Sequence, residues 1–184
     1  MKITPTKIEG VLILEPKIFH DDRGYFLESY NKKTLKNLGI NISFVQDNQS
    51  FSKYGTIRGF HYQKGDFSQT KLIRIIQGEI LDVVVDVRQN SKTFGQSFAI
   101  KLSSQNNLQL FIPKGLAHGF SVLSKEAMIF YKCDNFYNKE SESGIIYNDK
   151  DLDVDWQVPI NKITISQQDL SLQTFKQYRE NPCF

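Results

Sequence analysis

Short runs rich in Val, Ile, Phe and Tyr recur along the middle of the chain, separated by Gly, Asn, Asp and Ser. This spacing is typical of a β-sandwich or a small barrel. The predicted strands are residues 11–15, 24–30, 42–51, 70–77, 79–88, 98–103, 108–113, 118–124 and 127–133. We therefore predict an all-β jelly roll, a sandwich that closes into a barrel with few short helices.

Residues 79–88 illustrate the pattern that favours an antiparallel sheet. Asp82, Val84 and Asp86 fall on one parity, while Leu81 and its alternate neighbours form an apolar set. Side chains alternate between the two faces of a strand, so the pattern predicts one core face and one wetter face. Antiparallel sheets commonly have such faces.

Helix signals are few. Residues 31–39 have a helical composition and end at Gly39, a plausible C-cap, and residues 166–178 could form short turns or one helix. A chain of 184 residues without repeats or linkers is expected to form one domain, residues 1–184.

Charge and composition exclude several classes of protein. The net charge is only +3 and no Lys/Arg block occurs, so the chain lacks the electrostatic footprint of a nucleic-acid binder. The one apolar run near the N-terminus is too short for a membrane span or a secretory signal, so we expect no membrane contact and a cytoplasmic location. Two cysteines, Cys133 and Cys183, are too few for a disulfide scaffold and are interpreted as free thiols.

Residues 58–74 place polar groups inside a β-rich stretch. His61 could act as a base near neutral pH if a carboxylate orients it. Lys71 follows ten positions later, and one hairpin could turn both side chains into a single cavity, where a cation would stabilise an enolate. The alternatives are a core histidine with backbone partners and a solvated edge-strand lysine. A metal site is disfavoured, because the histidines are widely separated singles.

The stretch Pro113-x-Gly115-x-x-His118 is the second informative motif. It predicts a turn followed by a strand, and it resembles the Pro-x-Gly-x-x-His turn of the cupin jelly rolls. In metal-binding cupins that histidine is a ligand, but the matching His-x-His pair is missing around His61. A cupin that has lost its metal and kept its pocket fits these residues better.

Taken together, the motifs resemble the dTDP-4-dehydrorhamnose 3,5-epimerase family, metal-free cupins of the pathway to L-rhamnose. The resemblance runs through residues 19–30, 45–63, 69–88, 109–120, 130–156 and 165–175, in the family's order. It implies that His61 is the base, that Asp169 orients it, that Lys71 stabilises the enolate oxygen at C4, and that Tyr131 returns a proton from the opposite face. No cofactor is implied.

The same resemblance implies a pocket for a dTDP-linked 4-keto-6-deoxyhexose. The substrate-binding residues carried over are Arg23, Phe26, Glu28, Gln46, Asn48, Arg58, His118, Tyr137 and Glu142. Arginines suit the diphosphate and aromatic rings suit the thymine. Gln168 stands where better-known members have a lysine, which puts one nucleotide contact in doubt. The family also implies a homodimer, with an N-terminal segment that crosses between subunits.

Three rival functions remain open at this point. A relative could invert only C3 or only C5 of a similar nucleotide sugar. A metal-dependent cupin such as a dioxygenase could be built around His61 and His118. A sugar-nucleotide binding module would hold the ligand without turnover.

Overall fold

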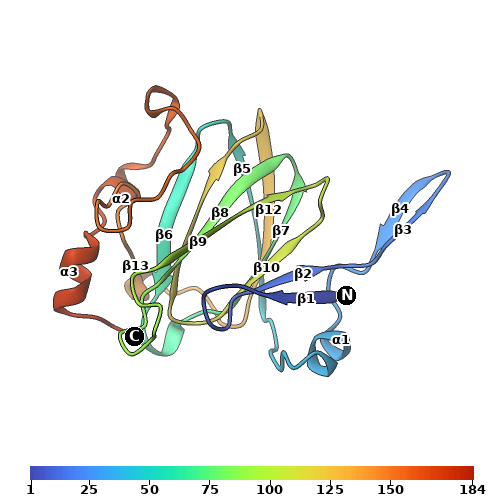
Figure 1. The fold of residues 1–184 in the computed structure, drawn as a ribbon, viewed down its shortest axis with the longest axis horizontal. Helices are drawn as coiled ribbons and strands as arrows, with labels where there is room; N and C mark the ends of the chain where they lie inside the picture. The colour runs from blue at the N-terminus through green and yellow to red at the C-terminus, as the bar shows by residue number, and fades with distance from the viewer.

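A computed structural model describes all residues, 1–184. Two antiparallel sheets face each other and close into a barrel (Figure 1). The six-stranded sheet has the order β1 (Lys2–Pro5), β2 (Leu12–Glu15), β10 (Gln109–Ile112), β7 (Lys71–Gln77), β12 (Glu126–Cys133) and β5 (Gln46–Lys53). The five-stranded sheet has the order β13 (Glu142–Gly144), β6 (Ile57–Gln63), β11 (Leu116–Val122), β8 (Glu79–Asp86) and β9 (Ser97–Ser103). The predicted all-β jelly-roll class is confirmed.

Few helices accompany the sheets. They are α1 (Lys32–Asn37), α2 (Gln167–Leu170), α3 (Phe175–Glu180) and the 3₁₀ turns Gly65–Phe67, Lys139–Ser141 and Ile160–Lys162. The Asn31 side chain caps α1 by accepting from the Thr34 N–H, and Gly39 follows the helix with φ +89°, as predicted. Residues 166–178 form two short helices, α2 and part of α3. No helix in the structure is long and apolar enough to span a membrane.

Three apolar clusters hold the layers together. The largest lies between the sheets, with members such as Ile73, Val84, Phe120 and Ile129. A second covers the outer face of the five-stranded sheet with C-terminal residues including Trp156 and Tyr178. A third packs α1, through Leu35, on the outer face of the six-stranded sheet. The outer face of the five-stranded sheet is therefore covered by the C-terminal segment, whereas α1 covers only part of the outer face of the six-stranded sheet, where Phe51 and Ile76 remain exposed.

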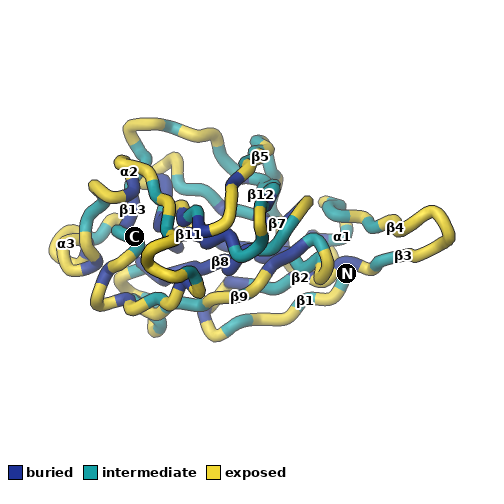
Figure 2. Tube along the Cα trace, turned by 90° about the horizontal axis from the view of Figure 1, so that it is seen from above, coloured by how far each residue is buried: buried dark blue, intermediate teal, exposed yellow.

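Strand β8 differs from its prediction. Every residue from Ile80 to Asp86 is buried, as the tube in Figure 2 also shows along β8. The predicted wetter face does not exist, because Val84 packs between the sheets and Val83 under the C-terminal segment. Asp82 and Asp86 are 0% exposed and must find protein partners instead of water.

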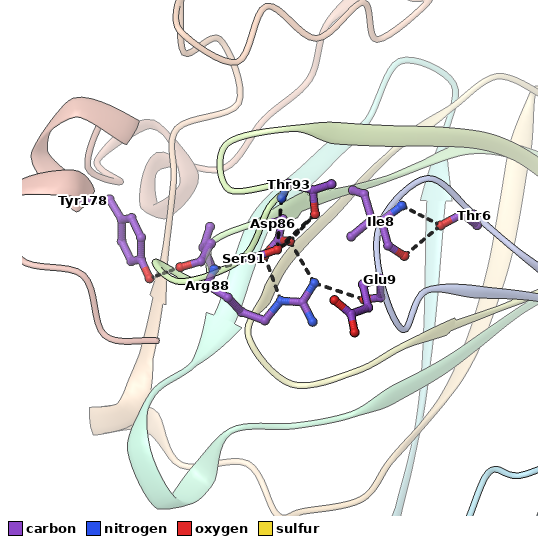
Figure 3. Close-up of polar contacts among 9 residues, drawn as sticks. Thr6, Ile8, Glu9, Asp86, Arg88, Ser91, Thr93 and Tyr178 are labelled. Atoms are coloured by element: carbon purple, nitrogen blue, oxygen red, sulfur yellow. Dashed lines mark hydrogen bonds and ion pairs between the residues drawn. The ribbon is translucent and has the colours of Figure 1, made fainter.

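Asp86 finds its partners at the end of β8, in the network of Figure 3. Its carboxylate accepts from the Arg88 Nε at 2.9 Å and Nη2 at 2.8 Å, and from the hydroxyls of Ser91 and Thr93. Burial opposes its ionisation, but these hydrogen bonds outweigh burial and lower the pKa of Asp86. Arg88 also donates to the Glu9 carbonyl, so the pair fastens the N-terminal turn to β8.

Asp86→Asn is expected to lower the free energy of unfolding by roughly 2–3 kcal/mol, because it removes buried hydrogen bonds to a charged group. Chemical denaturation measures this change. Asp151→Asn is a control, since Asp151 forms an ion pair with Arg179 in which both side chains are about half exposed. The control should leave the unfolding midpoint in place, and equal losses in both variants would contradict the role of burial.

A two-stranded hairpin, β3 (Ile18–Asp21) and β4 (Gly24–Leu27), belongs to neither large sheet. It projects well away from the barrel (Figures 1 and 2). Its aromatic side chains are exposed, and Phe26 is 68% exposed. An exposed aromatic ring on a projecting hairpin has no core to pack against within this chain.

Candidate active site

His61 lies on β6 and is oriented by Asp169 of α2. The distance from His61 Nε2 to Asp169 Oδ1 is 2.7 Å, and Asp169 Oδ2 accepts the Gly59 N–H at 3.2 Å. Burial raises the pKa of Asp169, but the hydrogen bonds from His61, Gly59 and Ser166 outweigh burial and lower it. An ionised carboxylate only accepts, so Nε2 carries the hydrogen and Nδ1 is left as the basic nitrogen.

The position of Asp169 follows from a helix cap. Ser166 is the N-cap of α2, and its hydroxyl accepts the Asp169 N–H at 3.0 Å. The cap starts the helix so that the Asp169 side chain, itself buried, points at β6. The structure thus brings together His61 and Asp169, the pair that the family resemblance implies, although they are 108 residues apart in the sequence.

A second His–Asp pair lies directly beside the first. His118 on β11 is the register partner of His61 on β6. Its Nε2 lies 3.1 and 3.0 Å from the two oxygens of Asp82, which is fully buried on β8. Asp82 was not predicted to be a site residue, although the parity of residues 79–88 sets it apart from its apolar neighbours.

Lys71 lies on β7 in the opposite sheet, so the predicted hairpin between His61 and Lys71 is wrong. The intervening residues 64–70 cross from one sheet to the other. The Lys71 ammonium is in no ion pair, and its Nζ lies 5.9 Å from the centroid of the Tyr131 ring. Burial lowers the pKa of Lys71, although Cys133 and the carboxylates of Asp82 and Glu142 act against burial.

The unpaired ammonium of Lys71 is expected to lower the stability of the folded protein. Burial lowers the pKa of Lys71 in the folded protein, so its charged form is less stable there than in the unfolded chain. The resulting loss of stability is fully present below the lowered pKa and disappears as pH rises from that value to about 10.4, the pKa of an unperturbed lysine. Lys71→Met should therefore melt no lower than wild type, and a gain of about 1 kcal/mol would raise the melting temperature by about 2–4 °C. Thermal melting measures it, with exposed Lys101→Met as the control. A clear drop confined to Lys71→Met would reveal a stabilising partner for the ammonium.

Tyr131 on β12 stands next to Lys71 on the inner face of the six-stranded sheet. Burial raises its pKa, with Cys133 and Glu142 acting in the same direction and Arg58 against them. The phenol therefore stays protonated at neutral pH and can donate a proton. Tyr131 and His61 belong to facing sheets, which is the placement that an acid and a base on opposite sides of a ligand require.

A cavity of about 690 Å³ opens beside His61. His61, Asp169, Arg58, Glu142 and Gln168 are among its lining residues. The Arg58 Nε donates to the buried Ser52 hydroxyl at 3.1 Å, which orients the guanidinium. Such a volume accommodates a ligand of the size of a nucleotide sugar.

Glu142 lines this cavity and is hydrogen-bonded to two other predicted or lining residues. Its Oε2 accepts from the Tyr137 hydroxyl at 2.9 Å and from the Gln168 Nε2 at 3.1 Å. The hydrogen bond to Glu142 is the main reason that the pKa of the exposed Tyr137 is raised. Gln168, where the family resemblance leads one to expect a lysine, thus serves as a neutral donor that joins α2 to β13.

The remaining predicted residues divide into two groups. Gln46 and Asn48 lie on β5 and reach toward Tyr137 and Cys133 respectively. Arg23 and Phe26 lie on the β3–β4 hairpin, which projects from the barrel (Figure 1) and contributes none of the cavity's lining residues. Glu28 follows that hairpin and accepts from the Asn31 side chain at 3.0 Å. Within one subunit, the predicted site residues of the hairpin therefore lie apart from the other predicted site residues.

The two histidines have separate carboxylates, and no three His, Cys, Asp or Glu side chains are grouped as they would be to hold a metal ion. What the site does offer is a carboxylate-oriented base on one sheet and an unpaired cation with a protonated phenol on the other. Such a set can remove a proton next to a carbonyl, stabilise the resulting oxyanion and return a proton.

Comparisons with known proteins agree with this chemistry. A model of the family described as dTDP-4-dehydrorhamnose 3,5-epimerase matches residues 5–177. The dTDP-4-dehydrorhamnose 3,5-epimerase of Shigella flexneri is 46% identical over 176 residues, 95% of this chain and 96% of that protein.

Solved structures extend the match. The crystal structure of the dTDP-4-dehydrorhamnose 3,5-epimerase from Elizabethkingia anophelis NUHP1 has a TM-score of 0.92 at 48% identity, covering 96% of this chain and 97% of that one. The epimerase from Legionella pneumophila Philadelphia 1, solved in complex with dTDP-4-keto-L-rhamnose, has a TM-score of 0.91 at 44% identity, covering 95% and 93%.

Proposed function

The chain belongs to the dTDP-4-dehydrorhamnose 3,5-epimerase family, and from this premise we propose how its own residues perform the reaction. The enzyme inverts C3 and C5 of dTDP-4-dehydro-6-deoxy-D-glucose and gives dTDP-4-dehydro-L-rhamnose. The observation that supports the assignment of roles is the placement of the His61–Asp169 pair on one sheet and of Lys71 and Tyr131 on the facing sheet.

The first half of each inversion is proton removal. The C4 ketone acidifies the hydrogens on C3 and C5. His61 Nδ1 takes one of these protons, and the electrons of the broken C–H bond form an enolate whose charge rests on the C4 oxygen. Asp169 stabilises the imidazolium. Lys71, which has no competing ion pair, stabilises the oxyanion.

The second half is proton return from the other side. The Tyr131 O–H bond breaks, its proton forms the new C–H bond on the face opposite His61, and the enolate electrons restore the ketone. A single group would put the proton back on the face from which it came. His61 then releases its proton and Tyr131 regains one from solvent, and the cycle repeats at the second carbon.

The nucleotide is held at the cavity mouth. Arg58 carries the cation for the diphosphate, Tyr137 offers an aromatic face to the thymine, and Glu142 accepts hydrogen bonds beside them. Gln168 is uncharged, so Arg58 carries more of the diphosphate recognition here than it would beside a lysine.

We also propose a homodimer in which the β3–β4 hairpin completes the partner's cavity. The hairpin projects from the barrel and exposes Phe26 together with Arg23, the two residues that lie far from their own chain's cavity. Arg23 would supply a second cation and Phe26 a second aromatic face. Sedimentation equilibrium tests this arrangement, and a mass of one chain, 21.3 kDa, would contradict it.

Proton NMR of the product tests the proposed reaction itself. Wild-type protein and dTDP-4-dehydro-6-deoxy-D-glucose in ordinary buffer should give ring couplings that report inverted configuration at both C3 and C5. Inversion at one carbon would identify a mono-epimerase. An unchanged sugar that still binds would identify a sugar-nucleotide binding protein, and loss of turnover on chelation would identify a metal-dependent cupin.

A further inference from the structure

A chain of side-chain hydrogen bonds runs along the inner face of β5 toward Lys71. The Tyr137 backbone N–H donates to the Gln46 Oε1 at 2.9 Å, and the Gln46 Nε2 donates to the Asn48 Oδ1 at 3.1 Å. The Asn48 Nδ2 then donates to the Cys133 Sγ at 3.7 Å. This chain of hydrogen bonds therefore begins at Tyr137, in the segment proposed to hold the nucleotide, and ends at the buried thiol of Cys133.

The Tyr137 backbone N–H determines the donor-to-acceptor direction of these hydrogen bonds. A backbone N–H can only donate, so Gln46 must turn its carbonyl oxygen toward Tyr137 and its amide nitrogen toward Asn48. Asn48 must then accept with its oxygen, which leaves its nitrogen facing Cys133. The orientation of the Asn48 amide thus follows from the order of donors and acceptors.

The strand register places this amide next to the catalytic cation. Asn48 is opposite Tyr131 in the β5–β12 pair, and Cys133 is opposite Lys71 in the β12–β7 pair. The neighbouring Asp134 N–H bonds to the Thr70 carbonyl, so Cys133 and Lys71 form a non-hydrogen-bonded pair, whose side chains stand closer together. Asn48 and Lys71 consequently flank the same sulfur.

One of the two N–H groups of the Asn48 amide has no hydrogen-bond partner within the protein. Its nitrogen carries two hydrogens, and one of them is used on the Cys133 sulfur. Its oxygen is engaged by Gln46. What Asn48 can offer a ligand beside Lys71 is therefore an N–H, which suits an oxygen that gains negative charge.

We propose that Asn48 is a catalytic residue, the second hydrogen-bond donor to the C4 enolate oxygen beside Lys71. The proposal rests on the proposed epimerase function and deepens it. Gln46 and Cys133 are positioning residues that fix the direction of the Asn48 amide. The same hydrogen bonds connect Tyr137, which is proposed to contact the nucleotide, to Asn48 beside the reacting carbonyl. Binding energy at Tyr137 therefore contributes to positioning the Asn48 amide.

Asn48→Ala tests the proposal, with Gln49→Ala as a matched control. Gln49 is the next residue on β5 and its side chain is exposed. Asn48→Ala should lower kcat about 10²-fold, as removal of one oxyanion donor does, while the Kd for dTDP, measured by calorimetry, stays within about twofold of wild type. Gln49→Ala should match wild type in both. If wild type itself has no turnover, the proposed function fails and not this inference.

Two results for Asn48→Ala would overturn the proposal. A kcat for Asn48→Ala within about threefold of wild type would overturn the proposal. So would a loss of dTDP affinity as large as the loss of kcat/KM, which would make Asn48 a nucleotide contact. If Asn48→Ala does not fold, Asn48→Ser takes its place in the same comparison.

The cysteines give a second, independent test of the positioning step. Cys133→Ala removes the acceptor for the Asn48 amide and should lower kcat several-fold without changing dTDP affinity, whereas Cys133→Ser keeps an acceptor and should recover most of the rate. Cys183→Ala, at the chain's exposed cysteine, is the control. Equal kcat in Cys133→Ala and Cys133→Ser would overturn the role of the thiol as an acceptor.

Discussion

Replacement of His61 by asparagine is expected to lower turnover about 10²–10⁴-fold, the usual contribution of a general base. Asparagine is polar and smaller than histidine, but its amide has no basic nitrogen and cannot take a proton from carbon at neutral pH. Deuterium entry from heavy water should therefore stop at C3 and at C5 together. Proton NMR of the sugar ring follows both positions in one sample.

The nucleotide gives the control for this variant. His61 lies on the sugar side of the proposed pocket, so the affinity of His61→Asn for dTDP should equal that of wild type. Deuterium exchange at the wild-type rate in His61→Asn would assign the base to another residue. Loss of exchange at only one carbon would mean that the two centres use different bases.

Replacement of Tyr131 by phenylalanine is expected to separate exchange from inversion. The variant keeps the ring beside the Lys71 ammonium and loses only the hydroxyl, whose raised pKa keeps it protonated in wild type. His61 can still remove a proton and return deuterium to the same face. Inversion should fall about 10²–10⁴-fold, while deuterium continues to enter a sugar of unchanged configuration.

Two NMR rates measure this separation, the loss of the ring proton signals and the appearance of product couplings. Tyr54→Phe, at an exposed tyrosine of the β5–β6 turn, is the control and should keep both rates. If exchange and inversion fall together in Tyr131→Phe, the hydroxyl is needed for proton removal. If inversion persists at the wild-type rate, another group supplies the second proton.

Much of the β architecture could be predicted because strand periodicity is local. Residues 70–77 and 79–88 are close to the observed β7 and β8, and the turn at Gly115, with φ +82°, lies where the motif placed it. Strand β6 was not among the predicted strands, although His61 lies on it. Its apolar residues Ile57, Phe60 and Tyr62 do not alternate regularly with polar ones, so the segment gives a weak strand signal.

The wrong predictions share a physical cause, because each concerns a position that is set by contacts between residues far apart in the sequence. Asp82 was assigned to a wet face because its partner His118, 36 residues away, is not visible in a strand pattern. His61 and Lys71 were placed on one hairpin because their spacing permits it, yet residues 64–70 connect two different sheets. Sheet membership depends on packing, not on spacing.

The site residues show the same division between local and distant signals. Motif resemblance identified His61 and Asp169, which the structure joins in one hydrogen bond. No motif pointed to the buried hydroxyl of Ser52, which orients Arg58, or to Cys133 as the end of the amide chain from Tyr137. A serine or cysteine within a strand gives no sign of its partner across the sheet.

In the proposed mechanism, two groups on opposite faces of the sugar exchange protons with solvent at each inverted carbon. The most direct test is the deuterium content of the product formed by wild-type protein in heavy water during the first turnover. Both inverted centres, C3 and C5, should carry deuterium in essentially every product molecule, since the returned proton comes from Tyr131 and not from the substrate. Inverted product that retains its original hydrogen at C3 or C5 would contradict the proposed mechanism, because one group would then have carried that hydrogen from face to face.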